Sequence, residues 1–278
     1  MLQFIRHYLL AVQFFTRIPV TGRLAEWVGY SPEMLRASAA HFPGIGVVMG
    51  GAAAAVFALL LLVLPDTPFT PLVAAAFSTV ATVWLTGGFH EDGLADVADG
   101  LGGSYDRDRA LEIMKDSRVG AFGAMALVLA LLAKVALLAL LGSVEVLADA
   151  EETPAFGGGY VCAALWLGHI VSRGLPLVMI RLLPHVGDTA ASKSKPLADQ
   201  ISAGGLLVAF FWCFGALVLA SHWFDAINLA FACGLSVLAL LGLLRFFRRR
   251  LQGFTGDCLG STQQVCEIAF YLGLAVSL

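Results

Sequence analysis

The sequence predicts an all-α, polytopic integral membrane protein with about seven transmembrane helices and an amphipathic helix at the N-terminus. Of its 278 residues, 59% are hydrophobic and 13% are charged, and that charged fraction is about half of what a soluble domain carries. The mean hydropathy is +0.83. Together with a series of apolar runs long enough to cross a bilayer, these values exclude a soluble globular fold.

Seven apolar runs have the roughly 17–25 residues that a membrane-spanning helix needs. They cover residues 44–64, 71–87, 120–141, 160–182, 204–221, 227–244 and 261–278. The last run is the most polar, because Gln263, Gln264 and Glu267 occupy its first two turns. The opening MLQFIRHYLLAVQFFTRIPV is interrupted by Arg6 and Arg17. It therefore favours an interfacial amphipathic helix over a cleavable signal peptide.

Basic residues alternate between the connectors of these runs. They occur in the N-terminal segment and after the second, fourth and sixth runs, as Arg6, Arg17, Arg23, Arg36, Arg107, Arg109, Lys115, Arg118, Lys193, Lys195, Arg245, Arg248, Arg249 and Arg250. The connectors 65–70, 143–159 and 222–226 contain no Lys or Arg. The positive-inside rule then places the N-terminus and every basic connector in the cytoplasm. Since no break in composition divides the chain, residues 1–278 are expected to form a single membrane-embedded domain.

The stretch HEDGLADVADG, which starts at His90, places four carboxylates directly after an apolar run. Asp92, Asp96 and Asp99 are spaced i, i+4, i+7, so in a helix they share one face. Unit charges about 4 Å apart repel by roughly 4 kcal/mol at an effective dielectric near 20. Such a face needs a cation, and oxygen ligands suit Mg²⁺ before Ca²⁺ or Mn²⁺, with Glu91 as a further ligand. The alternatives are a solvated acidic face with Asp92 as a helix N-cap, or a zinc site using His90 and Glu91.

The stretch EIMKDSRVGAFG, which starts at Glu112, mixes cations with Asp116 and enters the third run through glycines. Cations beside a carboxylate metal site suit phosphate binding, because the metal and the basic groups share the negative charge of the ligand. Lys115 and Arg118 are therefore candidate substrate-binding residues. The alternative is that they are ordinary cytoplasmic flanking charges.

A second acidic element, GFTGDCLGSTQQ, places Asp257 between glycines in a turn that opens the last helix. Asp257 is a candidate metal ligand, and the alternative is a helix N-cap.

His169 and Arg173 lie within the fourth apolar run at i and i+4. Charge at membrane depth costs about 2.5–3.5 kcal/mol on insertion scales and indicates function by default. Both residues are therefore candidates for substrate binding. The alternative is a structural pair with a carboxylate from another helix.

Three of these stretches together resemble the cobalamin synthase family, the adenosylcobinamide-GDP ribazoletransferases. They are TGGFHEDGLADVADGLGG from Thr86, LEIMKDSRVGAFG from Leu111 and GFTGDCLGS from Gly253, and QFFTRIPV from Gln13 is similar to that family's start. The resemblance covers nearly the whole chain. It implies an enzyme that joins α-ribazole, or its 5′-phosphate, to adenosylcobinamide-GDP with release of GMP, late in cobalamin synthesis. It also implies Mg²⁺ dependence and the cytoplasmic membrane of a bacterium or archaeon.

The chemistry of that reaction suits the acidic residues. A ribazole hydroxyl attacks the phosphorus attached to cobinamide, and metal ions that bridge the diphosphate would neutralise charge and orient an in-line attack. Asp92, Asp96 and Asp99 fit as the main ligands, and Asp257 as a further one. Either Asp96 or Asp99 could instead be the base, and Arg118 would hold a phosphate oxygen through its planar fork.

Two other functions remain open at the level of sequence. The acidic pattern is reminiscent of CDP-alcohol phosphotransferases, but Asp96 follows Ala95 where that family has Arg, and no fourth Asp occurs at the expected spacing. A cation-coupled transporter would use the acidic stretch as an ion site, yet that stretch lies at a helix end and the sequence shows no inverted repeat. The net charge of −3 gives no general attraction to nucleic acid, and a homo-oligomer stays open.

Overall fold

The computed structural model describes residues 2–151, 159–187 and 200–278. The helices of this part of the chain are α1 (Leu2–Phe15), α2 (Gly22–Val28), α3 (Pro32–Ser38), the 3₁₀ turn η1 (Ala39–His41), α4 (Phe42–Val63), α5 (Thr70–Thr86), α6 (Phe89–Gly103), α7 (Arg107–Ile113), α8 (Ala121–Glu151), α9 (Gly159–Leu182), α11 (Ala203–Ala220), α12 (Ala226–Arg250) and α13 (Gly256–Val276). The predicted basic residues Lys193 and Lys195 lie outside the described residues.

The prediction of an all-α, multi-pass membrane protein is confirmed. Five helical segments are long and apolar enough to cross a membrane, namely Pro32–Val63, Ala121–Val144, Gly159–Leu182, Ala203–Ala220 and Ala226–Arg250. Helices α5 and α6 form a pair bent by 90°, which makes six if the pair counts as one span. Helix α13 covers the seventh predicted run but is not among the five. Length and composition thus support five or six of the seven predicted spans.

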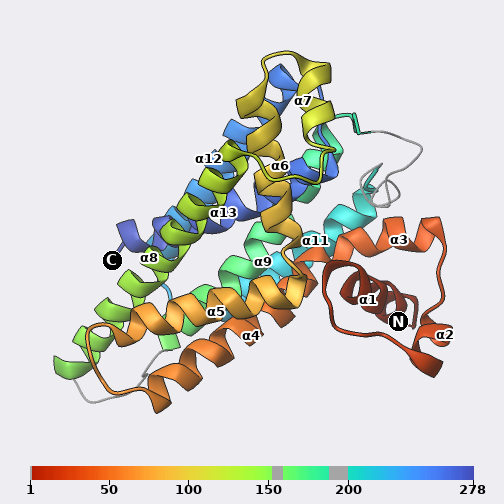
Figure 1. Cartoon of the computed structure of the whole chain (residues 1–278). Coiled ribbons are helices and arrows are strands. Elements are labelled where there is room, and N and C mark those ends of the chain that lie inside the picture. The colour runs from red at the N-terminus through yellow and green to blue at the C-terminus, as the bar shows by residue number, and fades with distance from the viewer. Residues whose placement is uncertain (1, 152–158, 188–199) are drawn as a thin grey trace.

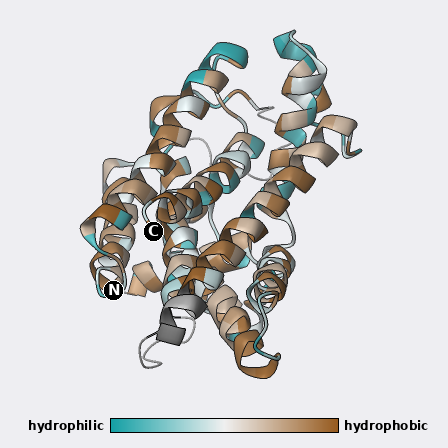
Figure 2. Cartoon of the chain, turned by 90° about the vertical axis from the view of Figure 1, so that its left-hand side faces the viewer, coloured by the Kyte–Doolittle hydropathy of each residue, from teal (hydrophilic) through white to brown (hydrophobic). Residues whose placement is uncertain are grey.

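Helix α9 lies at the centre of the bundle. In its most apolar window 72% of the residues are buried within the protein, against 17% for α8, α11 and α12. The outward faces of those three helices carry exposed apolar side chains such as Leu129, Phe211 and Leu238. Figure 2 shows the outer helices mostly in the hydrophobic colour. An exposed apolar surface of this extent is typical of a protein that a lipid bilayer covers.

A glycine corner turns the acidic helix α6 away from the apolar helix α5. Gly87 and Gly88 both have φ of 72°, a conformation that glycine adopts without steric cost. A Cβ at Gly87 would overlap the guanidinium of Arg17, whose backbone N–H donates to the Leu85 carbonyl at 2.7 Å. Figure 1 shows the result: α5 runs beside α4 in the lower part of the bundle, and α6 rises steeply from its end toward α7.

Two of the predicted basic connectors meet at one end of the molecule. Arg250, the last residue of α12, donates to the carbonyl oxygens of Leu101 and Ser104 at 3.1 and 2.6 Å. Arg107, the first residue of α7, donates to the Leu251 carbonyl at 2.8 Å. The connectors after the second and sixth apolar runs therefore lie on the same side of the bundle, as the alternation of charge predicts.

The predicted N-terminal helix is present as α1. Its second half buries Leu10, Ala11, Val12 and Phe15 against α3, η1 and α4. Together with α2 and α3, α1 lies beside the long helices rather than among them (Figure 1). The rings that α1 turns inward form part of the pocket described below.

Candidate functional site

Helix α6 carries the acidic stretch, and its three aspartates are buried to different degrees. Asp92 is exposed, Asp96 is half-buried and Asp99 is buried. The N-cap of α6 is Gly88, so Asp92 lies in the first turn and the N-cap alternative does not hold. A carboxylate in the first turn is stabilised by the positive end of the helix dipole. The helix that the spacing predicts is confirmed, and its three aspartates differ in their exposure to solvent.

The structure places Asp257 beside α6, as predicted. A Cβ at Gly93 of α6 would lie 2.9 Å from the carbonyl oxygen of Asp257 and 3.1 Å from its Cα, so only glycine permits this approach. The N-cap of α13 is Thr255, whose hydroxyl donates to the Asp257 carboxylate at 3.2 Å. The N-cap alternative for Asp257 is therefore wrong, and its carboxylate stands next to those of α6.

The ionisation of Asp96 is opposed by burial and by the negative charge of the surrounding carboxylates. It lies on α6, outside the five apolar spans. Burial, followed by the charges of Asp257, Asp92 and Asp99, raises the pKa of Asp96 to about 7. Burial also raises the pKa of Asp257, and the charge of Asp92 adds to that rise. Because these carboxylates oppose one another's ionisation, a cation between them would be strongly favoured.

Asp99 holds the start of α8 against α6. Its two carboxylate oxygens accept hydrogen bonds from the backbone N–H groups of Gly120 and Gly123 at 2.7 and 2.8 Å. A Cβ at either glycine would overlap the carboxylate. Both oxygens are thus engaged by backbone donors, and Asp96 is the better placed of the two candidate bases.

Gly123→Ala should destabilise the protein by about 1–3 kcal/mol, the usual cost of overpacking. The added methyl group would overlap the Asp99 carboxylate and lie 2.9 Å from the Ala95 carbonyl oxygen. The matched control is Gly242→Ala in α12, where a Cβ meets nothing within 4 Å. Thermal unfolding in detergent compares the two variants. Equal unfolding temperatures would contradict the tight fit of Asp99.

The predicted phosphate-binding residues Lys115 and Arg118 lie in the connector between α7 and α8, and both are exposed. Arg118 pairs with Asp116, whose Oδ1 accepts from the Arg118 Nε at 2.9 Å. The Arg118 side chain is 87% exposed, so it does not reach the acidic group. Its backbone is nevertheless close, because Gly120, two residues on, donates to Asp99. The connector that carries Lys115 and Arg118 therefore lies beside the carboxylates of α6.

His169 and Arg173 belong to a buried ionic network. Each is 2% exposed, and Arg173 Nη1 lies 2.8 Å from His169 Nδ1. Glu267 of α13 approaches His169 Nδ1 at 3.5 Å and Lys134 of α8 at 2.6 Å. The structure thus shows the alternative, a pair with a carboxylate from another helix. The sequence reasoning missed Lys134, although a single lysine inside the run 120–141 was a visible signal.

Glu91 connects this network to α6. Gln264 of α13 donates to Glu91 Oε1 at 2.9 Å and to Gln263 Oε1 at 2.9 Å. Gln263 in turn donates to Glu267 at 2.6 Å. Glu91 is only 9% exposed, so it belongs to the buried network rather than to the open carboxylates, where the sequence placed it as a metal ligand.

The donor chemistry of Asp92, Asp96 and Asp257 fits a hard divalent cation. All three offer only oxygen ligands, and burial, together with the charges of the neighbouring carboxylates, raises the pKa of Asp96. Within residues 2–151, 159–187 and 200–278, no three His, Cys, Asp or Glu side chains are grouped closely enough to hold a metal ion as they stand. Binding of an ion therefore requires these carboxylates to turn toward one another.

Comparison with known proteins gives one consistent result. A family model described as cobalamin-5-phosphate synthase matches residues 7–275. Curated relatives from several bacteria carry the name adenosylcobinamide-GDP ribazoletransferase. The one from Polaromonas naphthalenivorans (strain CJ2) is 87% identical over 278 residues, 100% of both chains. That of Albidiferax ferrireducens is 62% identical over 292 residues, again 100% of both. That of Vibrio cholerae serotype O1 is 38% identical over 270 residues, 95% of this chain and 91% of the relative. No solved structure matches the chain.

Proposed function

Because the chain belongs to the cobalamin-5-phosphate synthase family, we propose that it joins α-ribazole, or its 5′-phosphate, to adenosylcobinamide-GDP. It is a transferase of cobalamin synthesis. The observation that carries the finer assignment is the 87% identity to a relative of that name over the full length of both chains. The carboxylates of α6 and α13 could bind the cation and accept the proton that this reaction requires.

The bond changes of the reaction assign a role to Asp96. A ribose hydroxyl of the nucleoside attacks the phosphorus attached to cobinamide, and a new oxygen–phosphorus bond forms. The bond from that phosphorus to the GMP oxygen breaks, and GMP leaves with the electron pair. The hydroxyl proton passes to a carboxylate. Asp96 suits this task, because a pKa of about 7 lies near the pH at which a general base works best.

Asp92 and Asp257 are the residues that would hold Mg²⁺ beside Asp96. When bound, Mg²⁺ neutralises the charge of a diphosphate and stabilises the leaving phosphate oxygen. Lys115 and Arg118 would bind the outer phosphate oxygens. Arg118 would exchange its contact with Asp116 for a phosphate, which its planar fork can bind through two parallel hydrogen bonds.

The test is direct. The purified chain, in detergent or liposomes, is incubated with adenosylcobinamide-GDP, α-ribazole 5′-phosphate and Mg²⁺. The expected result is release of GMP together with the joined product, and its loss when EDTA removes the cation. Absence of GMP would overturn the proposal, and release that persists in EDTA would overturn the role of Mg²⁺.

The alternation of basic connectors supports an orientation in which the N-terminus and the carboxylates face the cytoplasm. In a variant without its native cysteines, Arg249→Cys should react with a membrane-impermeant maleimide only from the cytoplasmic side. His222→Cys, in a connector without basic residues, is the matched control and should react only from the opposite side. Labelling of both positions from one side would contradict the orientation.

A further inference from the structure

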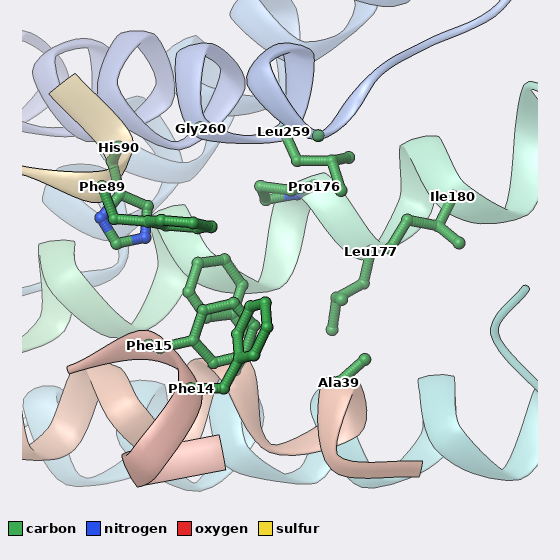
Figure 3. A pocket seen from close by; sticks show the side chains of 12 residues that line it. Phe14, Phe15, Ala39, Phe89, His90, Pro176, Leu177, Ile180, Leu259 and Gly260 are labelled. Carbon is green, nitrogen blue, oxygen red and sulfur yellow. The ribbon is translucent and has the colours of Figure 1, made fainter. Parts of the chain in front are cut away.

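A narrow apolar pocket lies where α1, α4, α6, α9 and α13 meet. One wall is aromatic and consists of Phe14, Phe15, Phe42, Phe89 and His90. The other wall is largely aliphatic and includes Pro176, Leu177, Ile180 and Leu259. Figure 3 shows the rings of Phe14 and Phe15 facing Pro176 and Leu177 across the gap. The open volume is about 40 Å³.

The aromatic rings pack against one another along one side of this narrow slot. The ring of Phe42 stacks on Phe15, with centroids 4.3 Å apart and planes 26° apart, and on His90 at 5.5 Å and 17°. Phe89 meets His90 edge-on at 5.5 Å. Phe42 is thus held between two other rings, and a planar aromatic ligand could extend this packing against the rings at the edge of the wall, Phe14 and Phe89.

His90 brings an unused hydrogen-bonding group to this slot. It is 1% exposed, and neither ring nitrogen has a hydrogen-bond partner among the described residues. Buried polar atoms of native proteins are nearly always paired, so an unpaired one calls for an explanation. A neutral imidazole offers one donor and one acceptor, and a bound ligand could supply the missing partner.

The pocket adjoins the carboxylates. Gly256 and Gly260 of α13 line it, and Asp257 lies between them in the first turn of that helix. Phe89, which also lines the pocket, precedes Asp92 by three residues on α6 and so lies on the same face of that helix. A ligand with one part in the slot can therefore place a neighbouring part beside Asp92 and Asp257.

We infer that this pocket binds the aromatic base of the ribazole nucleoside, with the ribose directed toward Asp92 and Asp257. The inference rests on the proposed function. A benzimidazole-type base is flat and apolar, and its free ring nitrogen accepts a hydrogen bond that a His90 N–H can donate. Phe14 is half-buried and Phe89 is 41% exposed. Because the base is larger than the open volume, these two rings move outward as it enters.

The first experiment uses benzimidazole alone as the probe. Titration calorimetry of the purified chain should show benzimidazole binding without either substrate. In the transferase assay, benzimidazole should compete with α-ribazole 5′-phosphate and not with adenosylcobinamide-GDP. Competition with adenosylcobinamide-GDP, or no binding at all, would overturn the inference. Binding seen in detergent but lost in lipid nanodiscs would assign the pocket to a lipid chain and also overturn it.

Two variants locate the effect. Leu177→Phe fills the slot, and His90→Phe keeps the ring while removing both nitrogens. Each should raise KM for α-ribazole 5′-phosphate about tenfold, the size expected for one lost hydrogen bond or an obstructed ring. KM for adenosylcobinamide-GDP should stay unchanged. The control is Phe69→Ala, which removes a 71% exposed ring before α5 and should change neither constant.

The outcomes separate the two proposals. If the wild-type chain releases GMP but both variants keep the wild-type KM for the nucleoside, the pocket is wrong and the transferase stands. If the wild-type chain releases no GMP but binds benzimidazole, and Leu177→Phe abolishes that binding, the transferase is wrong and the aromatic pocket stands. Should one variant fail to fold, the other variant and the wild-type competition still decide.

Discussion

Asp96→Asn should lower kcat by a factor of about 10²–10⁴, the range expected for loss of a general base. The amide keeps the size of the side chain but can neither accept the hydroxyl proton at pH 7 nor carry charge toward a cation. Release of GMP by the purified chain measures the effect, and circular dichroism checks that the helices persist. The matched control is Asp108→Asn, the same change at a side chain that is 85% exposed on α7. A near-normal kcat for Asp96→Asn would contradict a role for this carboxylate.

The pH dependence of the wild-type enzyme should follow the same carboxylate. The pKa of Asp96 is raised to about 7 from an ordinary value near 3.9. A carboxylate must be ionised to accept a proton, so activity should fall as the pH drops through the pKa of Asp96 in the Mg²⁺-bound enzyme, which lies below 7 because a nearby cation favours the ionised form. The stability of the fold should change with pH in the opposite direction. Because the folded state disfavours the ionised form of Asp96, the free energy of unfolding falls as the pH rises toward 7. Asp96→Asn should therefore unfold no more easily than wild type at pH 8.

Glu267→Ala should destabilise the folded protein by about 3–5 kcal/mol, the cost of removing one partner of a buried ion pair. Lys134 and Glu267 are 2% and 1% exposed and lie 2.6 Å apart. Without the carboxylate, Lys134 and Arg173 would be left as buried cations. Since native proteins are stable by only about 5–15 kcal/mol, much of the purified variant should be aggregated. Thermal unfolding in detergent and the monodisperse fraction on gel filtration measure this.

The chain offers a matched control, an exposed ion pair with the same N–O distance. Arg109 and Glu112 also lie 2.6 Å apart, but their side chains are 61% and 69% exposed. An exposed pair contributes about 0–1 kcal/mol, so Glu112→Ala should unfold almost as wild type does. The double variant Lys134→Met with Glu267→Gln removes both charges and should lose less stability than Glu267→Ala alone. Equal unfolding temperatures for Glu112→Ala and Glu267→Ala would show that the buried Lys134–Glu267 pair matters no more for stability than the exposed pair.

The parts of the site that sequence predicted are those that local periodicity determines. Spacing of four and seven residues placed Asp92, Asp96 and Asp99 on one helix, and that helix exists. The convergence of Asp257 with α6 was predicted from charge topology, since both adjoin basic connectors that are assigned to one side of the membrane. Local pattern carries such information because helical repeats depend on neighbours in sequence.

The parts that sequence could not predict depend on which helix faces which. Glu91 adjoins Asp92 in sequence, yet it is buried against α13, where the side-chain amide of Gln264, far along the chain, donates to its carboxylate. Hydropathy does not reveal the direction in which Gly87 and Gly88 turn the chain, nor that Asp99 meets the N–H groups of Gly123. Arg118 was expected to lie beside the carboxylates of α6, but its guanidinium donates to Asp116, a carboxylate of its own connector.

The glycines around the carboxylates set how this enzyme can change over evolution. At Gly93 and Gly123 even one added methyl group would meet the backbone of another segment or the Asp99 carboxylate. No substitution at these positions is small enough to be neutral, so the spacing of the carboxylates can hardly drift by single steps. The walls of the neighbouring pocket consist of ordinary side chains of graded size, such as Leu177 and Ile180. A descendant that accepts a different nucleoside is therefore expected to carry its substitutions in those walls, with its reaction chemistry unchanged.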